Sequence, residues 1–418
     1  SGVASTAVFP GGLILFVILY VVSPVMMNIN LPATFVVSVP MGNGEFQQIT
    51  QNLKDWSSFL PKWEMSVPGE YSQYNLIGLA TIMYIFRSSI DGMSGSGGYM
   101  IQRFYAAKNE REVGLLSVFW IFLLSFRWPF IMSIAILGIS YSQLGNVIDN
   151  PETVLPKVLM ELFPVGIKGL LVAGLLAAAM STYVAIVNSG AAYWVNDLYQ
   201  RFIKPEATNK ELILHSRIAS VAIVILGLMS TYLFTSLNDV WGFLTMGFGV
   251  GLIVPQFIRW YWWRFNGYGY AGGTIIGMIT AISIRFFFDD IAEMPSFYLT
   301  AAITFVGSVV VSYLFPATDE SDLKEFYART RPFGFWGPIR KTFSSSFIEP
   351  IRTENRRDIL ATIVAVPWML FLGITPMMVV TKQWTYALIC GSVLVILSVL
   401  LYFLWYKHLS KETDKEMA

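Results

Sequence analysis

Long apolar stretches constrain this chain more than any other feature. A helix that crosses a lipid bilayer needs about 20 mostly apolar residues, and we count ten such stretches. They cover residues 8–26, 75–100, 114–141, 166–196, 212–234, 239–264, 270–288, 296–315, 358–380 and 384–406. Because lipid offers no partner to a free backbone amide, runs of this length are predicted to be helices and not barrel strands. Only 13% of the residues are charged, against about 25% in soluble proteins. We therefore expect an all-α, polytopic membrane protein with about ten transmembrane helices.

The positive residues predict the orientation of these helices. The loops alternate between the two sides of the membrane, and the side that holds residue 1 receives twenty of the 28 Lys and Arg residues, eight of them within 316–357. The positive-inside rule makes this side cytoplasmic. We expect a multi-pass protein of the cell membrane (plasma or inner) with a cytoplasmic C-terminus. The long loop 27–74 is then external, and it is equally consistent with an interfacial cap over an entry path and with a plain surface loop.

The rarest residue types exclude several functions. Cys390 is the one cysteine in the sequence, which leaves no disulfide framework and no cysteine metal site. The two histidines, His215 and His408, lie at predicted helix ends and are too far apart to suggest a metal or acid–base site. No nucleophile–base pair is evident, so we expect no catalytic residues and no enzyme. The net charge of +1 says nothing about an acidic partner or nucleic acid, and we expect no nucleic acid among the partners.

Three charged side chains lie where lipid disfavours them. Arg87, Asp91 and Arg127 fall inside predicted spans, and a charge at the bilayer centre costs at least about 3 kcal/mol on insertion scales. Arg87 and Asp91 are four residues apart on one helix, which allows an ion pair. Two interpretations stay open: a structural pair, and a charged group that lines a substrate path.

The segment 88–98 is unusual for a membrane span, because glycine and serine dominate it after Asp91. We expect the helix to be interrupted or distorted there, with carbonyls and amides that an ion, water or ligand must satisfy. Close helix packing by small residues is the alternative interpretation.

A second small-residue segment, 174–182, ends in two neighbouring hydroxyls, Ser181 and Thr182. Sodium is a hard cation and prefers oxygen ligands, and Ala178, one turn earlier, adds a carbonyl oxygen if the helix bends. For an isolated Ser–Thr pair the simpler interpretation is a hydrogen bond from each hydroxyl back to the carbonyl four residues earlier.

The sequence around this pair resembles a known family. Residues 169–182, GLLVAGLLAAAMST, with Asn188-Ser189 and Asp197-Leu198-Tyr199 after them, resemble the signature helix of the sodium:solute symporter family. The segments 99–108, YMIQRFYAAK, and 259–267, RWYWWRFNG, resemble the cytoplasmic ends of the family's core helices six and ten. The order and spacing of these segments agree with the family over nearly the whole chain.

The resemblance implies the leucine-transporter-type fold, in which two five-helix repeats are inverted relative to one another. In this register we expect a partial symporter core over 1–268, made of core helices five to ten and the external loop 27–74. Two peripheral transmembrane helices over 269–315, a cytoplasmic linker over 316–357, and two C-terminal helices with a tail over 358–418 would follow. We expect about five further helices, including core helices one to four, from an upstream segment or from a partner chain.

The resemblance also implies the binding residues. Ala178 would offer its carbonyl, and Ser181 and Thr182 their hydroxyls, to the family's conserved sodium site, whose other ligands come from core helix one. A second sodium site is expected to be missing, because Val184 and Ala185 stand at its hydroxyl positions and no acid occurs in residues 1–44.

The substrate path is expected to use residues of the charged and small-residue segments. These are Arg87, Asp91, Met93, Ser94, Arg127 and Phe243. Met93 stands where sugar-transporting relatives have an aromatic gate, and Phe243 near their polar position on core helix ten. The pocket is thus unlike a sugar site, and the arginines hint at an anionic solute.

Together these inferences predict a sodium-coupled symporter of a small organic solute, working in the lipid bilayer by alternating access, with Na⁺ as the coupling ion. The alternative is a transport-inactive membrane sensor or assembly subunit that keeps the symporter fold. Sodium-stimulated uptake would separate the two.

Overall fold

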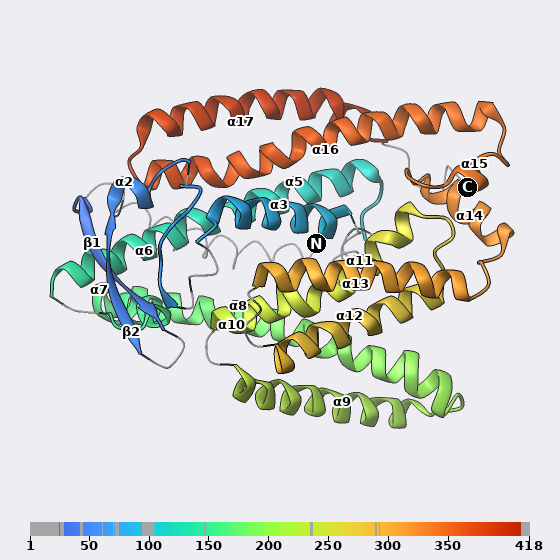
Figure 1. Cartoon of the computed structure of the whole chain (residues 1–418), viewed down its shortest axis with the longest axis horizontal. Coiled ribbons are helices and arrows are strands. Elements are labelled where there is room, and N and C mark those ends of the chain that lie inside the picture. The colour runs from blue at the N-terminus through green and yellow to red at the C-terminus, as the bar shows by residue number, and fades with distance from the viewer. Residues whose placement is uncertain are drawn as a thin grey trace. The chain divides into compact units, whose positions relative to one another are not determined.

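Helices dominate the structure (Figure 1), a computed structural model that describes most of the chain. The described residues are 25, 29–41, 45–60, 62–69, 71, 75–93, 104, 106–145, 148–234, 237–288, 291 and 293–410. In these ranges eight helical segments are long and apolar enough to cross a membrane. They are Glu110–Gln143, Val165–Ile203, Asn209–Leu233, Val240–Tyr261, Gly267–Phe287, Met294–Leu314, Ser345–Val380 and Trp384–His408.

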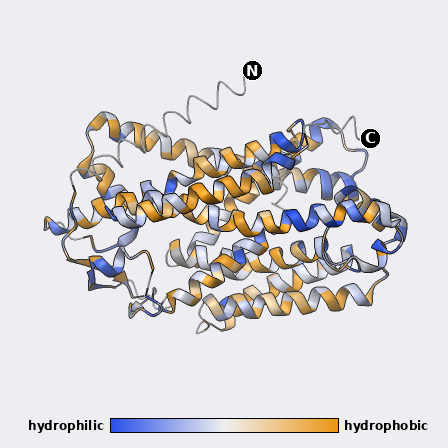
Figure 2. Ribbon diagram, turned by 90° about the horizontal axis from the view of Figure 1, so that it is seen from above, coloured by the Kyte–Doolittle hydropathy of each residue, from blue (hydrophilic) through white to orange (hydrophobic). Residues whose placement is uncertain are grey.

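The eight segments coincide with eight of the ten predicted stretches, which confirms the polytopic helical architecture. The stretch 8–26 lies almost entirely outside the described residues, and 75–100 is described only as far as Met93. Hydrophobic residues cover the long helices, and hydrophilic residues gather at helix ends and in the connecting segments (Figure 2). This distribution suits helices surrounded by lipid.

The chain divides into two compact units, which we describe one at a time. The first comprises residues 152–240 of the described chain, and the second comprises the described parts of 21–151 and 241–418. The elements of unit 1 are α7 (Val154–Leu162), α8 (Val165–Ala192), the π-helix η3 (Tyr193–Ile203), α9 (Asn209–Ser230), the 3₁₀ turn η4 (Thr231–Leu233) and the start of α10 (Leu237–Gly242). A 3₁₀ turn, η2 (Pro151–Thr153), lies at the boundary.

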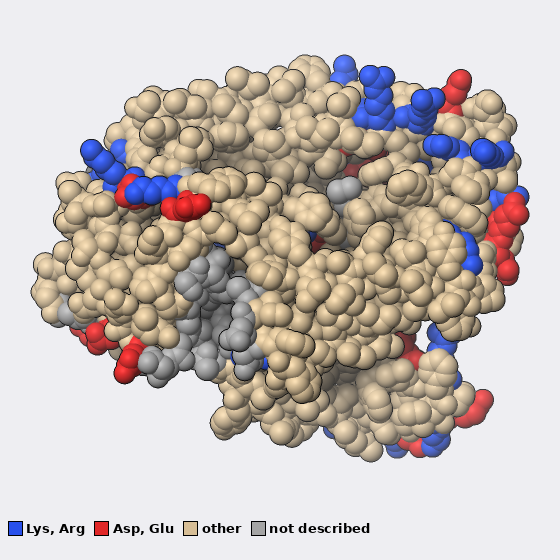
Figure 3. All heavy atoms as spheres, in the orientation of Figure 1, with Lys and Arg blue, Asp and Glu red and all other residues tan. Residues whose placement is uncertain are grey.

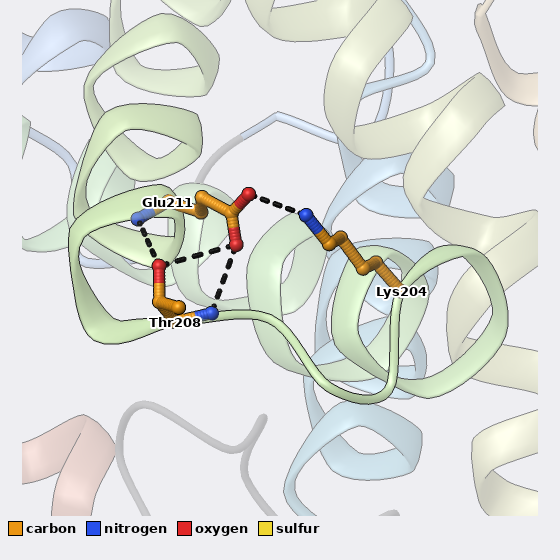
Figure 4. Close-up of polar contacts among 3 residues, drawn as sticks. All are labelled: Lys204, Thr208 and Glu211. Atoms are coloured by element: carbon orange, nitrogen blue, oxygen red, sulfur yellow. Dashed lines mark hydrogen bonds and ion pairs between the residues drawn. The ribbon is translucent and has the colours of Figure 1, made fainter.

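In unit 1, α8 and η3 form a hairpin with α9, whose turn is held by a capping box (Figure 4). Thr208 Oγ1 accepts from the Glu211 amide, and Glu211 Oε2 accepts from the Thr208 amide at 2.9 Å. The Lys204 ammonium pairs with the other carboxylate oxygen of Glu211, and this hydrogen bond raises the pKa of Lys204. Further along the hairpin, the rings of Tyr199 and His215 stack with centroids 3.7 Å apart. His215 thus has a packing role.

The first half of unit 2 contains two strands and four helices. These elements are β1 (Thr34–Pro40), β2 (Phe46–Asn52), α2 (Leu53–Trp56), α3 (Ile77–Met93), α5 (Glu110–Ser125) and α6 (Arg127–Gln143). Hydropathy does not reveal the β1–β2 hairpin. The strands pair antiparallel with Val37 opposite Ile49. The predicted span 114–141 lies within the helical segment Glu110–Gln143, which Phe126, three residues before Pro129, divides into α5 and α6.

The described part of loop 27–74 packs on the turn between two distant helices of the same unit. Lys382 Nζ donates to Asn30 Oδ1 at 2.8 Å, and the Gln383 side chain donates to the Ser57 carbonyl. Phe59 stacks on Tyr386 with ring centroids 5.5 Å apart. The described part of this loop is therefore fixed to the turn between α16 and α17.

The second half of unit 2 contains the remaining spans. Its elements are the π-helix η5 (Phe243–Phe248), α11 (Gly249–Tyr261), α12 (Gly267–Phe287), α13 (Glu293–Leu314), α14 (Glu320–Thr330), α15 (Gly337–Arg340), α16 (Ser345–Val380), α17 (Trp384–Leu404) and the 3₁₀ turn η6 (Tyr406–His408). The predicted linker 316–357 is itself largely helical, since it holds α14, α15 and the first turns of α16.

Small residues let α11, α12 and α13 approach closely. A Cβ added at Gly277 of α12 would lie 2.5 Å from the Gly251 Cα of α11 and 2.5 Å from Thr304 Oγ1 of α13. On α13, buried hydroxyls recur every fourth residue and face this seam; they are Thr300, Thr304, Ser308 and Ser312. Small residues in such an interface allow the backbone contact on which helix association in lipid depends.

Residues 406–410, which we call the C-terminal segment, contact the first turns of α5. Arg111 Nε donates to the Tyr406 hydroxyl at 3.3 Å, and the Arg111 amide donates to the Ser410 carbonyl at 3.2 Å. The Ser410 amide in turn donates to Glu110 Oε2 at 3.2 Å. A Cβ added at Gly114 would lie 2.6 Å from Leu409 Cδ1, so the two segments are in direct contact.

Candidate functional site

The predicted sodium ligands lie in the middle of α8, in unit 1. Alanine and leucine dominate the segment around them, and both favour helix, so the backbone stays helical through Ala178, Ser181 and Thr182. The spacing of three and four residues then places these three residues on one face of the helix.

Three oxygen atoms converge on that face. Ser181 Oγ donates to the Ala178 carbonyl at 2.9 Å, and Thr182 Oγ1 donates to the same carbonyl at 3.2 Å. The Thr182 bond is the one to the fourth preceding carbonyl that the simpler interpretation predicts, whereas Ser181 bonds the third preceding carbonyl. They also bring one carbonyl and two hydroxyl oxygens, all uncharged, into a single cluster.

The oxygen cluster is accessible. In the described chain every residue from 175 to 184 is exposed, and Ala178, Ser181 and Thr182 are among them. Uncharged oxygens fit the preference of a hard cation, although three of them form only part of a coordination shell. The structure thus keeps together the ligands that the resemblance assigns to this chain.

The predicted substrate residues belong to unit 2, so their geometry is described separately. Arg87 on α3 is partly buried, and its Nε donates to the Thr245 carbonyl at 3.0 Å. Thr245 lies in the π-helix η5, and its own hydroxyl donates to the Trp241 carbonyl at 2.6 Å. Arg87 therefore connects α3 to the element that precedes α11.

The local backbone makes this contact possible. A π-helix shifts hydrogen bonds from the fourth to the fifth residue, and such segments occur often at functional sites. Gly249 follows η5, and a Cβ there would lie 2.6 Å from the Leu244 carbonyl and 4.0 Å from Arg87 Nη2. In the described chain the terminal nitrogens of Arg87 make no hydrogen bond and no ion pair.

The other predicted substrate residues are less closely grouped. Asp91 is exposed and makes no ion pair among the described residues, so the possible pair with Arg87 is not formed there. Arg127 is exposed at the first turn of α6, with its guanidinium carbon 5.0 Å from the centre of the Trp128 ring. Phe243, the first residue of η5, is partly buried, with its ring 6.1 Å from that of Phe248.

Part of the predicted site lies beyond the description. Met93 ends α3, but its side chain is not described, and Ser94 lies outside the described residues. The predicted interruption in 88–98 is described only to Met93, up to which α3 is continuous. Sequence reasoning missed the role of Thr245 and Gly249. The run Gly247-Phe248-Gly249-Val250-Gly251, unusual for a helix interior, was the available signal.

Comparison with known proteins identifies the class of protein. A sequence model of the sodium:solute symporter family matches residues 6–277. This chain belongs to that family.

Individual relatives match shorter parts of the chain. Sodium/glucose cotransporter 4 of Danio rerio is 30% identical over 150 residues, which are 34% of this chain and 22% of the relative. The high-affinity proline transporter PutP of Bacillus subtilis (strain 168) is 30% identical over 34% of this chain and 30% of its own. The sodium/glucose cotransporter of Vibrio parahaemolyticus is 25% identical over 56% of this chain and 47% of its own. The matches thus span less than half the length of these relatives.

The family settles several predictions. It implies the leucine-transporter-type fold. It is a family of transporters and not of enzymes, and the prediction of a multi-pass membrane protein of this family is confirmed. The solute, the sodium ligands and the boundaries of the predicted domains stay predictions.

Proposed function

We propose that this chain acts in a sodium-coupled symporter of a small organic solute that works by alternating access. Family membership supports the transport class. The observation that carries the proposal is the convergence of Ser181 and Thr182 on the Ala178 carbonyl, at 2.9 and 3.2 Å.

This cluster suits reversible binding of Na⁺. Each hydroxyl uses its hydrogen in the bond to Ala178 and keeps two lone pairs. A bound ion would rotate both hydroxyl hydrogens away from itself and take the oxygens as ligands, so the back-bonds are exchanged for ion contacts. The family's core helix one would supply the remaining ligands. Neutral oxygens bind without a proton change, so the site would be insensitive to mild acid.

Arg87 is the residue that we propose for solute recognition. Its Nε is held by the Thr245 carbonyl, which fixes the guanidinium while the terminal nitrogens remain available in the described chain. A planar pair of donors suits a carboxylate or phosphate on the solute. A partly buried Arg in a membrane protein also needs a compensating anion, and an anionic solute would provide it.

The experiment is sodium-stimulated uptake into vesicles by the reconstituted transporter, with a panel of labelled sugars, amino acids and organic anions. The double change Ser181→Ala/Thr182→Val removes both hydroxyls while nearly keeping side-chain volume. We expect the sodium concentration for half-maximal uptake to rise about tenfold or more, since hydrogen-bond-like contacts to a charge are worth about 1.5–3 kcal/mol each. The thermal midpoint should change little.

The control is Ser220→Ala on α9 of the same unit. Its hydroxyl makes the same kind of back-bond, to the Ser216 carbonyl at 2.9 Å, and has no proposed ligand role. If this control raises the sodium requirement as much as the double change does, the sodium site is misplaced. Absence of uptake for every solute in the panel, with or without sodium, would favour the transport-inactive sensor or assembly subunit.

We propose further that the C-terminal tail and the segment 316–357 are cytoplasmic in the cell membrane. Eight of the Lys and Arg residues lie in this segment, and the positive-inside rule supports that side. A reporter that is active only in the cytoplasm, fused after Ala418, should be active. Activity of a reporter that works only outside the cell would reverse the topology.

A further inference from the structure

Helix α16 extends well beyond the thickness of a bilayer. Helix α16 has 36 residues, a length of about 54 Å, against about 30 Å for the hydrocarbon core. Its apolar part begins near Ile359, and the preceding turns are polar. Those turns, with α14 and α15, form a juxtamembrane segment that we call the cap (residues 320–357).

Aromatic packing holds the cap together and fixes it to α11. Its buried core contains Leu323, Tyr327, Trp336, Ile339 and Ile351. Trp336 Nε1 donates to the Trp260 carbonyl at 2.8 Å, and the Phe335 amide donates to the Tyr261 carbonyl at 2.6 Å. The cap is therefore a folded element with a defined surface.

A cavity of about 370 Å³ opens within the cap and reaches Ile359 and Leu360, where the apolar part of α16 begins. Aromatic and aliphatic side chains supply most of its wall, among them Tyr327, Phe333 and Trp336 from the cap. This volume lies within the range of small-molecule sites, roughly 300–1,000 Å³.

Along the face of α16 that lines the cavity, the side chains change from charged to apolar. Arg352 and Arg356 are four residues apart, and Ile359 and Leu360 continue the same face at the i+3 and i+4 positions. The charged part and the apolar part are thus about one to two turns apart. The change falls where α16 passes from polar to apolar sequence, which is where a membrane interface would lie.

The arginines that line the cavity have no anionic partner in the described chain. Arg340, Arg352 and Arg356 are exposed and form no ion pair there. Two neighbouring arginines do form ion pairs. Arg331 pairs with Glu354 at 3.3 Å, and Arg357 pairs with Asp358 at 3.6 Å. Lys and Arg gather over this end of α16 in the space-filling view (Figure 3).

We propose that this cavity binds an anionic phospholipid. The phosphate group would lie among Arg340, Arg352 and Arg356, and an acyl chain would run along Ile359 and Leu360. Basic groups beside a transmembrane helix attract anionic lipid headgroups, and guanidinium groups bind phosphate through paired hydrogen bonds.

The apolar wall favours a lipid over a soluble anion. A free phosphate or nucleotide needs the arginines, but it gains nothing from an aliphatic surface that continues into a membrane-spanning helix. A phospholipid uses both parts at once and reaches them from the bilayer. This site is separate from the predicted sodium and solute residues, so the inference does not depend on the transport proposal.

The test measures dioleoylphosphatidylglycerol bound to the purified protein by native mass spectrometry, with dioleoylphosphatidylcholine and inorganic phosphate as comparison ligands. Wild-type protein should retain more dioleoylphosphatidylglycerol than dioleoylphosphatidylcholine. Inorganic phosphate at millimolar concentration should not displace the bound phosphatidylglycerol. The variant R340Q/R352Q/R356Q should bind it at least about tenfold more weakly.

The matched control is K324Q/R329Q/K341Q, which removes three cations of the same cap that do not line the cavity. It should keep most of the lipid binding. A second variant, Ile359→Trp, fills the apolar wall without changing charge and should also lose the lipid. Thermal unfolding checks that each variant is folded, and the wild-type lipid preference stands as evidence even if one is not.

Three results would overturn the proposal. Equal losses in the two triple variants would mean that only general charge attracts the lipid. Displacement by inorganic phosphate would indicate a soluble-anion site. Equal retention of the two lipids by the wild-type protein would show that the cavity has no anionic selectivity.

Discussion

Gly334 adopts a backbone conformation that other residues tolerate poorly. Its φ is +114°, and a Cβ there would lie 2.7 Å from the Tyr261 carbonyl oxygen. The next residue, Phe335, donates to that same carbonyl. A single glycine therefore lets the cap approach the end of α11 closely enough to bond to it.

Replacing Gly334 by Ala should lower the free energy of unfolding by about 1–3 kcal/mol, because it adds backbone strain and a steric clash. Gly337→Ala is the matched control, since a Cβ at Gly337 meets nothing within 4 Å. Thermal unfolding in detergent measures both. Equal midpoints for the two variants would mean that the cap does not depend on this contact.

At the residue scale, the sequence signal for the Ser181–Thr182 pair is chemical and local, and its role as a sodium ligand stays a prediction. The Ser181–Thr182 pair stands out because two hydroxyls follow a run of small residues, and a helix of known pitch brings them to the Ala178 carbonyl. The partner of Arg87 was not predictable in the same way. It is a backbone carbonyl, which carries no side-chain signal, in a π-helix 158 residues away along the chain.

At the scale of elements, the contact of α12 with α11 and α13 depends on the absence of side chains. Gly277 lies against Gly251 on one side and Thr304 on the other. Asn266 closes the end of this group, because its side-chain amide donates to the Pro316 carbonyl at 2.8 Å and its oxygen caps α12 at the Gly269 amide.

Gly277→Ala should destabilise unit 2 by about 1–3 kcal/mol, since the new methyl group overpacks a contact between two backbones. Gly267→Ala on the same helix provides the comparison, because a Cβ there meets nothing within 4 Å. It should be neutral or stabilising by up to about 1 kcal/mol. The measurement is the midpoint of thermal unfolding, and a larger loss at Gly267 would contradict the packing described for α12.

Hydropathy predicted the elements better than their ends. The spans 270–288 and 384–406 agree closely with α12 and α17 because their apolar runs begin and end sharply. Helix α16 begins 13 residues before the predicted span 358–380. Its first turns belong to the cap, where packing against α14 and α15 stabilises them instead of lipid. The hairpin of β1 and β2 has no strong alternation in its second strand, so only pairing reveals it.

At the scale of the whole molecule, the family and the composition agree. The 13% of charged residues and the spaced apolar runs indicated a polytopic membrane protein, and the match over residues 6–277 places it among sodium:solute symporters. The solute is not accessible to the same reasoning. Recognition depends on how side chains that are distant in the sequence face one another, and the sequence carries little information about that arrangement.

The contact between the C-terminal segment and α5 has a consequence for the order of synthesis. Arg111 cannot meet Tyr406 until 295 more residues have been added, which takes about 15–60 s at typical translation rates. Throughout that time Gly114 remains uncovered by Leu409. The first turn of α5 therefore gains its contacts with residues 406–410 only after that segment has been made, long after α5 itself has been synthesised.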